Sequence, residues 1–179
     1  MSQKSEDASQ ELSKMFTQMR DTPSAVNTHM DVITHYARLC DNVAEFGIGR
    51  CDAMLAIMNG LPEYYRGYCT NITPGAINVA AIASQLGVNI HLAEESSIKV
   101  SMVDEELDMV VLDDNYWRRN GELLDDLSWV HKYIIITHVG IVEDGEGDYT
   151  IPDFSIEKYV RPTAKNTFNG LLIYRRTEQ

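Results

Sequence analysis

The chain begins with two stretches in which apolar residues recur at helical spacing. A polar, acidic tail precedes them, and we expect residues 1–8 to fray. The first stretch predicts a helix that starts at Glu11 and ends at residues 21–24, where Pro23 cannot continue it. Its apolar stripe consists of Leu12, Met15, Phe16 and Met19. The second stretch predicts a helix over residues 28–40, with Met30, Ile33 and Ala37 on one face.

From residue 42 onward, short β-prone runs alternate with helical patterns. Strands are predicted at residues 42–46, 64–68, 88–93, 108–112, 133–137 and 170–174. Helices are predicted at residues 51–59, from Thr73 to Gly87, around Leu123, Leu127 and Val130, and at residues 154–160. The helix after Thr73 is expected to align Ile77, Ala80, Ala81 and Ser84 on one face. This alternation is typical of βαβ units, so we expect an α/β fold with a mostly parallel sheet. The runs at 108–112 and 133–137 are apolar on both faces, which predicts central strands.

Length, composition and charge limit the classes of function. The 179 residues, with 44% apolar and 23% charged positions, fit one globular domain. No apolar run approaches the ~20 residues of a membrane span, and no signal peptide is recognisable, so we expect a cytoplasmic protein with no membrane partner. Three cysteines, at positions 40, 51 and 69, are expected to be free thiols. A net charge of −12 argues against nucleic acid as a partner, because the protein would repel phosphate backbones.

Polar and acidic residues follow nearly every predicted strand. In an open α/β sheet, ligands bind at the carboxyl ends of the strands, so these residues are the candidate site. In chain order, they are Glu45, Gly47, Gly49 and Arg50; Cys69, Thr70 and Asn71; Glu94, Glu95 and Ser96; Asp113, Asp114, Asn115 and Tyr116; and His138 and Gly140.

The turn after the first predicted strand carries the most specific signal. Gly47 and Gly49 allow a sharp bend and a close approach of the backbone to a ligand, and a helix N-terminus follows. A phosphate ligand would call for a third glycine and a basic residue, whereas Cys51 stands near the third position and Glu45 precedes the turn. The turn therefore favours a cationic or amine-bearing ligand. A simple strand–helix turn without a ligand is the alternative, since two glycines are a weak motif.

Residues 43–49 (VAEFGIG) resemble motif I of class I S-adenosylmethionine-dependent methyltransferases. Four more segments resemble a small bacterial and phage-type subgroup of that family, in the family's order: 24–29 (SAVNTH), 109–113 (MVVLD), 133–138 (YIIITH) and 169–175 (NGLLIYR). The resemblance implies a three-layer sandwich with a Rossmann-like, seven-stranded sheet, mostly parallel with the last strand antiparallel. It also implies a single methyltransferase-like domain over residues 24–179, preceded by an N-terminal tail and helix at residues 1–23.

The resemblance also implies S-adenosylmethionine as cofactor and assigns roles to residues. The methionine part would be held by Glu45, Phe46, Gly47, Ile48 and Gly49, with the glutamate helping to orient the amino group. The ribose would meet Tyr68, Cys69 and Thr70, and the adenine would be flanked by Glu94, Glu95 and Ser96. Asp113 and Asp114 would border the methionine end and the acceptor, and His138 would lie on the acceptor side.

Some family features are missing. The third glycine is replaced near Cys51, and no acid follows the second strand, where Cys69 and Thr70 stand. The subgroup's histidine after the fourth strand and its aspartate after His138 are also absent. A catalytically decayed protein of the same fold, acting as a binding or regulatory partner, therefore remains the alternative.

Methyl transfer requires mainly that donor and acceptor be aligned, and a hydroxyl acceptor must also lose its proton. His138 and Asp113 are the predicted catalytic residues, with His138 as general base; a purely structural histidine at a strand end is the alternative. Asp113 and Asp114 are an incomplete metal site, because no acid–amide pair follows the fifth strand, so no metal is predicted. The acidic stretch at 143–148 is interpreted as an exposed loop over the acceptor pocket.

The predicted function is S-adenosylmethionine-dependent methyl transfer to a small-molecule or sugar hydroxyl. A nicotinamide-dependent enzyme is a weaker alternative, because the candidate site is acidic and the chain lacks GxGxxG. Besides the small-molecule acceptor, the expected partner is a second copy of the chain, in a homodimer formed through the N-terminal helices.

Overall fold

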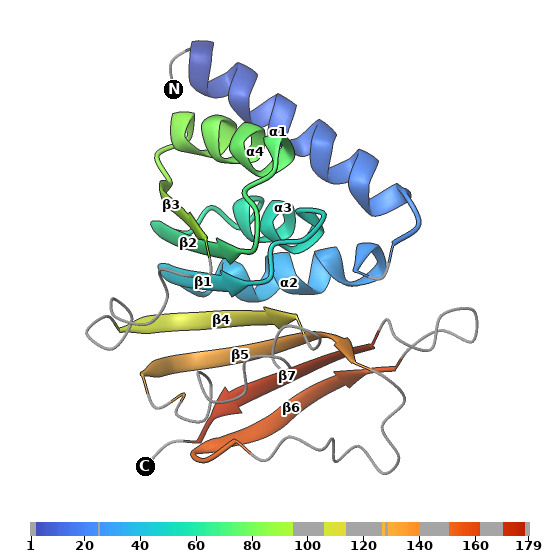
Figure 1. Ribbon diagram of the computed structural model, residues 1–179, viewed down its shortest axis with the longest axis vertical. Coiled ribbons are helices and arrows are strands. Elements are labelled where there is room, and N and C mark those ends of the chain that lie inside the picture. Colours follow the sequence, from blue (N-terminus) through green and yellow to red (C-terminus); the bar gives the residue numbers. More distant parts are fainter. Residues whose placement is uncertain are drawn as a thin grey trace.

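Seven strands form a single sheet in a computed structural model that describes residues 3–24, 26–94, 106–113, 127, 129–139, 151–161 and 170–177. The strand order is β3-β2-β1-β4-β5-β7-β6, as Figure 1 shows from top to bottom. The strands are β1 (Asn42–Phe46), β2 (Tyr64–Cys69), β3 (Asn89–Glu94), β4 (Leu107–Asp113), β5 (Val130–Val139), β6 (Phe154–Val160) and β7 (Gly170–Arg176).

The sheet is mostly parallel, as predicted. Strands β3, β2, β1, β4 and β5 pair in parallel, and β7 is antiparallel to both of its neighbours, β5 and β6. The strand β4 lies in the middle of the sheet with β5 beside it, which confirms the prediction that these two apolar strands are central. The chain runs outward from β1 to β3 and then returns to pair β4 with the other edge of β1. Ligands of open α/β sheets bind at the carboxyl ends of the strands flanking such a reversal.

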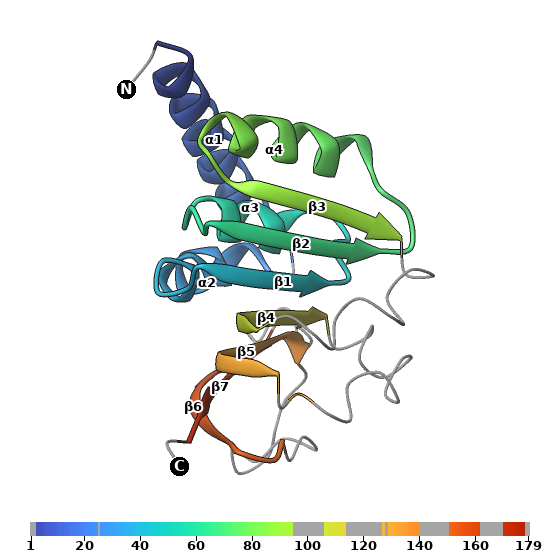
Figure 2. The ribbon, with the colours of Figure 1, turned by 90° about the vertical axis from the view of Figure 1, so that its left-hand side faces the viewer.

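The described helices share one hydrophobic core with one face of the sheet. They are α1 (Gln3–Asp21), the short 3-10 helix η1 (Asn27–His29), α2 (Met30–Ala37), α3 (Asp52–Met58) and α4 (Pro74–Gln85). Figure 2 shows α1 beside α4, above the helices α2 and α3. Helix α4 starts as the sequence predicts, because the Thr73 hydroxyl accepts a hydrogen bond from the Ala76 N–H at 3.2 Å and Pro74 follows it.

The opposite face of the sheet has a core of its own. Alternate strand residues, including Phe46, Val110 and Ile136, pack there with Leu127 and Ile151. The connections at residues 95–105, 114–126 and 140–150 lie outside the described residues, so a second helical layer on this face stays a prediction.

Three details of the predicted elements are wrong. Residues 154–160 form β6 rather than a helix, and Val130 begins β5 rather than belonging to a helix. Helix α1 starts at Gln3, well inside the tail that was expected to fray, because Ala8 is buried in the core with Leu12. The face of α4 with Ile77, Ala80, Ala81 and Ser84 is the more exposed one, since Ile77 is 55% exposed and the buried residues of the helix are Ala76, Val79, Ile82 and Ala83.

Among the described helices, none is both long and apolar enough to cross a lipid bilayer.

Candidate functional site

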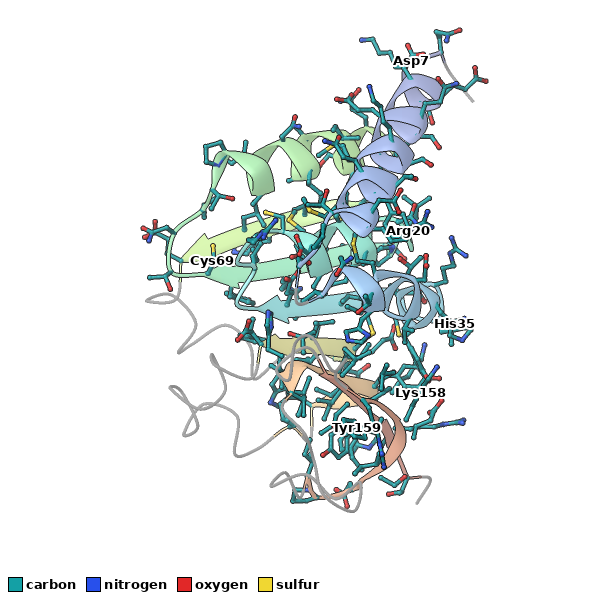
Figure 3. All side chains as sticks on the ribbon, turned by 90° about the vertical axis from the view of Figure 1, so that its right-hand side faces the viewer. Asp7, Arg20, His35, Cys69, Lys158 and Tyr159 are labelled. Atoms are coloured by element: carbon teal, nitrogen blue, oxygen red, sulfur yellow. The ribbon has the colours of Figure 1, made fainter. Side chains whose placement is uncertain are left out.

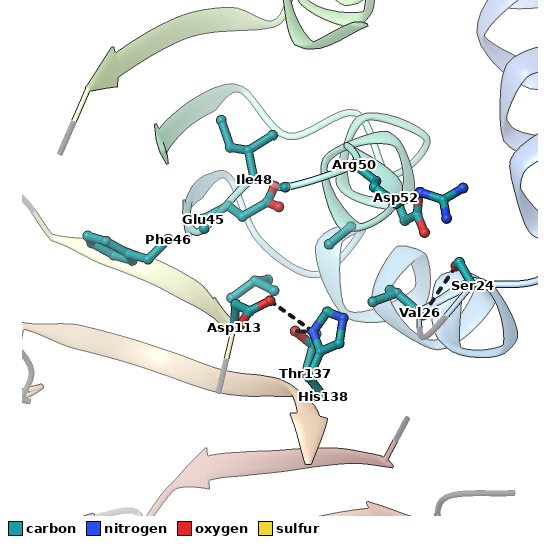
Figure 4. A pocket seen from close by; sticks show the side chains of 14 residues that line it. Ser24, Val26, Glu45, Phe46, Ile48, Arg50, Asp52, Asp113, Thr137 and His138 are labelled. Carbon is teal, nitrogen blue, oxygen red and sulfur yellow. Dashed lines mark hydrogen bonds and ion pairs between the residues drawn. The ribbon is translucent and has the colours of Figure 1, made fainter. Parts of the chain in front are cut away.

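A cavity of about 330 Å³ lies at the carboxyl ends of β1, β4 and β5 (Figure 4). Its volume falls within the range of small-molecule sites. Ser24 and Val26, from the segment between α1 and η1, line one end of it. The lining residues are Ser24, Val26, Glu45, Phe46, Gly47, Ile48, Gly49, Arg50, Asp52, Ala53, Val111, Asp113, Thr137 and His138.

The bend after β1 gives this cavity a wall of main chain. Gly47 and Gly49 have φ angles of 90° and 50°, a left-handed conformation that glycine adopts at no steric cost. The Gly47 N–H donates to the Tyr68 carbonyl oxygen at 2.9 Å, which holds the start of the bend against β2. Among the described residues, a Cβ added at Gly49 would meet a single atom within 4 Å, the Gly47 carbonyl oxygen at 3.7 Å, so none of their side chains fills the space beside Gly49.

Cys51 stands near the position of the third glycine in the methyltransferase motif that this bend resembles. Its φ is 69°, so a residue with a side chain adopts the left-handed conformation at the start of α3. This conformation costs a non-glycine residue roughly 1–2 kcal/mol. The Cys51 N–H donates to the Ile48 carbonyl oxygen at 2.9 Å, which closes the turn. The bend is therefore retained without the third glycine, at some cost in stability.

Glu45 is a buried carboxyl at the end of β1, with 2% of its surface exposed. The Tyr65 hydroxyl donates to its Oε2 at 2.7 Å. Burial raises the pKa of Glu45 to about 7 and outweighs the hydrogen bond from Tyr65, which lowers it; Asp113 and Asp52 nearby raise it further. Glu45 therefore changes charge near neutral pH, and it lines the cavity.

Gly67 allows this pair to form. It stands beside Glu45 in the register of β1 and β2, and a Cβ there would lie 2.6 Å from Ile48 Cδ1 and 2.8 Å from the Tyr65 hydroxyl. Any larger residue would therefore push against the bend and against the donor of the Glu45 hydrogen bond.

Two more carboxylates make the cavity acidic. Asp52, the first residue of α3, is 5% exposed, and its Oδ1 is buried without a hydrogen-bond partner among the described residues. Asp113 ends β4, and its Oδ2 lies 2.9 Å from His138 Nδ1. Arg50, exposed at the bend, is the basic residue of the lining. An acidic, partly enclosed cavity favours a ligand with positive charge, because buried carboxylates are stabilised by cations and donors.

His138, near the end of β5, has an unusual backbone conformation. Its φ of 60° is left-handed, and its Nδ1 lies 3.2 Å from the Thr137 hydroxyl oxygen as well as close to Asp113. The Thr137 hydroxyl donates to the Leu112 carbonyl oxygen at 3.3 Å, so its oxygen is left to accept. Both neighbours therefore favour a proton on Nδ1, which makes Nε2 the proton-accepting nitrogen of a neutral ring.

The structure brings together about half of the predicted site. Seven predicted residues line the cavity: Glu45, Phe46, Gly47, Ile48, Gly49, Asp113 and His138. Four described ones do not: Tyr68, Cys69, Thr70 and Glu94. Tyr68 stacks on Phe46 with ring centroids 5.0 Å apart, and Cys69 is the last residue of β2 (Figure 3). Glu95, Ser96 and Asp114 lie outside the described residues. All of these ligand contacts stay predictions.

Sequence reasoning did not single out Asp52, Thr137, Ser24 or Val26. Asp52 had a signal, since it is an acid at the start of the helix that follows the glycine bend. Ser24 and Val26 come from the segment 24–29 that resembles the methyltransferase subgroup. The Ser24 hydroxyl accepts from the Asn27 N–H at 2.9 Å, which turns the chain toward the cavity.

No protein-family model matches the chain, and no curated protein matches its sequence. Solved structures do resemble it. A methyltransferase from Geobacter sulfurreducens has a TM-score of 0.65 at 11% identity, covering 99% of this chain and 90% of that one. The O-methyltransferase from Bacillus cereus, in complex with SAH, has a TM-score of 0.63 at 12% identity, with coverage of 99% and 92%.

The O-methyltransferase TomG from Streptomyces achromogenes, in complex with SAM, has a TM-score of 0.63 at 14% identity, covering 99% of this chain and 91% of that one. At such low identity the likeness concerns the fold. The chain therefore has the class I methyltransferase fold, as the resemblance in its motifs predicted. Membership of the bacterial and phage-type subgroup stays a prediction.

Proposed function

We propose that this chain binds S-adenosylmethionine in the acidic cavity and transfers its methyl group to a hydroxyl of a small molecule or sugar. One observation carries the proposal: an open glycine bend and three carboxylates, those of Glu45, Asp52 and Asp113, line the same cavity. The fold supports it, because two of the structurally similar methyltransferases were solved with SAH or SAM bound.

The chemistry of the cavity suits this cofactor. S-adenosylmethionine carries two positive charges, on its sulfonium and its ammonium group, together with one carboxylate. Among the described lining residues, three acids and one arginine match that pattern of charge. The buried Asp52 oxygen without a partner is an acceptor that a bound donor group would satisfy. The space above Gly49 lets a ligand approach the main chain directly.

S-adenosylmethionine supplies a methyl group on a positively charged sulfur, and the chain has to align the acceptor and remove its proton. His138 is placed to accept that proton on Nε2. Asp113, 2.9 Å from Nδ1, orients the ring and stabilises its positive charge after the transfer. General-base catalysis of this kind contributes roughly 10²–10⁴-fold to a rate, and alignment supplies the larger remainder.

The acceptor is expected to be a small molecule because of the charge of the protein. With a net charge of −12, long-range repulsion disfavours nucleic acids and other polyanions. A neutral or cationic hydroxyl compound meets no such repulsion at the acidic cavity.

Calorimetric titration with S-adenosylmethionine and S-adenosylhomocysteine tests the proposal. Micromolar binding is expected, and Gly47→Arg should abolish it, because an arginine at φ 90° would strain the bend and enter the cavity. Circular dichroism would verify that the variant is folded. Methyl transfer from labelled cofactor to a panel of hydroxyl compounds would then identify the acceptor.

The alternative is a protein that keeps the fold as a binding or regulatory partner. It is favoured by the end of β2, where Cys69 and Thr70 stand in place of the acid that holds the ribose in the family. No binding of either ligand at millimolar concentration would support this alternative and contradict the enzyme proposal.

A further inference from the structure

Two charged side chains of the cavity are not yet matched to a particular part of the cofactor. Arg50, in the bend, and Asp52, at the start of α3, both line it. We infer that they form a zwitterion site that holds the amino-acid end of the cofactor: Asp52 accepts hydrogen bonds from its ammonium group, and Arg50 pairs with its carboxylate. This inference rests on the proposed function and assigns one end of the ligand to one end of the cavity.

Asp52 carries the first half of the argument. It is 5% exposed, and its Oδ1 has no hydrogen-bond partner among the described residues. A buried carboxylate oxygen in this state costs free energy, so such atoms usually await a ligand, an ion or a water.

The missing partner must donate hydrogen bonds. Of the two cationic groups of S-adenosylmethionine, the ammonium has three N–H donors and the sulfonium has none. An orphaned carboxylate oxygen therefore matches the ammonium group. The sulfonium, which needs only charge, can lie near the other acids.

The other two carboxylates are already engaged. Glu45 accepts the Tyr65 hydroxyl hydrogen bond at 2.7 Å, and Asp113 lies 2.9 Å from His138 Nδ1. They lie near the ends of β4 and β5, where His138 would remove the proton of the acceptor. Asp52 lies instead toward the end that Ser24 and Val26 line, as Figure 4 shows.

Arg50 supplies the opposite charge at the same end. Figure 4 shows its guanidinium and the Asp52 carboxylate extending from the bend and from α3 toward Ser24. Arg50 is exposed, so its side chain can reach a ligand without unfolding anything. A guanidinium binds a carboxylate through two parallel hydrogen bonds, and an α-amino acid presents its carboxylate beside its ammonium group. Arg50 and Asp52, two residues apart, therefore offer a cation for the carboxylate and an anion for the ammonium group.

The competing explanation is purely structural, because an acid in the first turn of a helix is favoured by the helix dipole. The two explanations differ in what they predict for ligands that lack the amino-acid end. If Asp52 were purely structural, substituting it would change the affinity for all ligands alike. If it belongs to a zwitterion site, the substitution would weaken only those ligands that carry the groups the site binds.

Calorimetry on Asp52→Asn and Arg50→Gln, with three ligands, separates them. Both variants should bind S-adenosylhomocysteine roughly tenfold more weakly than the unsubstituted chain, the loss expected for one charge-assisted hydrogen bond. Both should bind methylthioadenosine, which has no amino-acid end, as the unsubstituted chain does. Decarboxylated S-adenosylmethionine, which keeps the ammonium group, should be weakened by Asp52→Asn and unaffected by Arg50→Gln.

Matched controls change the same residue types outside the cavity. Asp31→Asn removes a carboxylate that is 68% exposed, and Arg38→Gln removes an exposed guanidinium; neither should alter any of the three affinities. Equal weakening of all three ligands by Asp52→Asn, or no weakening of S-adenosylhomocysteine by either cavity variant, would overturn the inference. If the unsubstituted chain binds none of the ligands, the proposed function itself fails, which is a distinct result.

Discussion

The imidazole of His138 and the carboxylate of Asp113 lie 2.9 Å apart, at the ends of two neighbouring strands. The register of the parallel strands β4 and β5 pairs Asp113 with Thr137, so His138 is one residue beyond the direct partner of Asp113. The left-handed φ of His138, 60°, accompanies a register shift next to it in the pairing of β5 with β7. A local irregularity at the strand end therefore accompanies the pairing of an imidazole with a carboxylate in the cavity.

We predict that His138→Ala lowers kcat for a hydroxyl acceptor by roughly 10²–10⁴-fold and leaves the affinity for S-adenosylhomocysteine nearly unchanged. The reason is that the imidazole would remove the acceptor's proton without holding the cofactor. Turnover and calorimetry on the same preparation would measure the two effects. Asp113→Asn should lower kcat as well. Undiminished turnover in His138→Ala would eliminate the base.

A second prediction concerns the pH dependence of cofactor binding. The pKa of Glu45 is raised to about 7, chiefly by burial, so the carboxyl is neutral below that pH and negative above it. A cationic ligand binds the negative form better, so affinity for S-adenosylmethionine should rise as the pH increases through about 7. Calorimetry between pH 5.5 and 8.5, spanning roughly 1.5 units on each side of that pKa, would follow it. Glu45→Gln should abolish the rise; a persisting rise would point to another group.

Glu45 also links the stability of the free protein to pH. Its pKa is about 7 in the folded chain, against 4.5 for an ordinary glutamate in water, so folding favours the protonated form. The stabilisation is complete below about pH 4.5 and is lost as the pH rises through about 7. It amounts to at most about 3 kcal/mol at 1.36 kcal/mol per pKa unit. Glu45→Gln keeps an acceptor for Tyr65, so it should unfold at higher denaturant concentration than the unsubstituted chain at pH 8, with the gap closing toward pH 5. An equal gap at both values of pH would contradict the linkage.

The sequence alone predicts the strands well where hydrophobic patterning is regular. Residues Asn42–Phe46 form β1 with the predicted bounds, and Asp108 and Tyr133 fall in the central strands as expected. It fails at β6, where the register with β7 shifts between Ile156 and Lys158. Such an irregularity breaks the alternation of apolar residues, so their spacing resembles that of a helix.

The residues of the candidate site also differ in how far the sequence predicts them. Glu45, Asp113 and His138 were predictable because each stands at or next to the end of a recognisable strand. Tyr65 was not, since its role depends on a contact between elements. Asp52 had a signal in its position after the glycine bend, but its burial in the cavity depends on how the elements pack. Tyr65 reaches Glu45 from the neighbouring strand, and Asp52 lines a cavity that Ser24 and Val26 also line. Local pattern contains no information on either contact.

The last prediction tests the close approach at Gly67. A Cβ there would lie 2.6 Å from Ile48 Cδ1 and 2.8 Å from the Tyr65 hydroxyl oxygen, so Gly67→Ala must displace the bend or the tyrosine. We expect a loss of roughly 1–3 kcal/mol in the free energy of unfolding, the usual cost of overpacking, and weaker binding of S-adenosylhomocysteine. Gly75→Ala is the matched control, because its Cβ would meet nothing closer than 3.7 Å and alanine favours the helix α4. Urea denaturation and calorimetry would measure both. If Gly67→Ala were as stable as Gly75→Ala and bound the ligand equally well, Ile48 and Tyr65 would have room to move, and the tight packing beneath Glu45 would have no part in shaping the cavity.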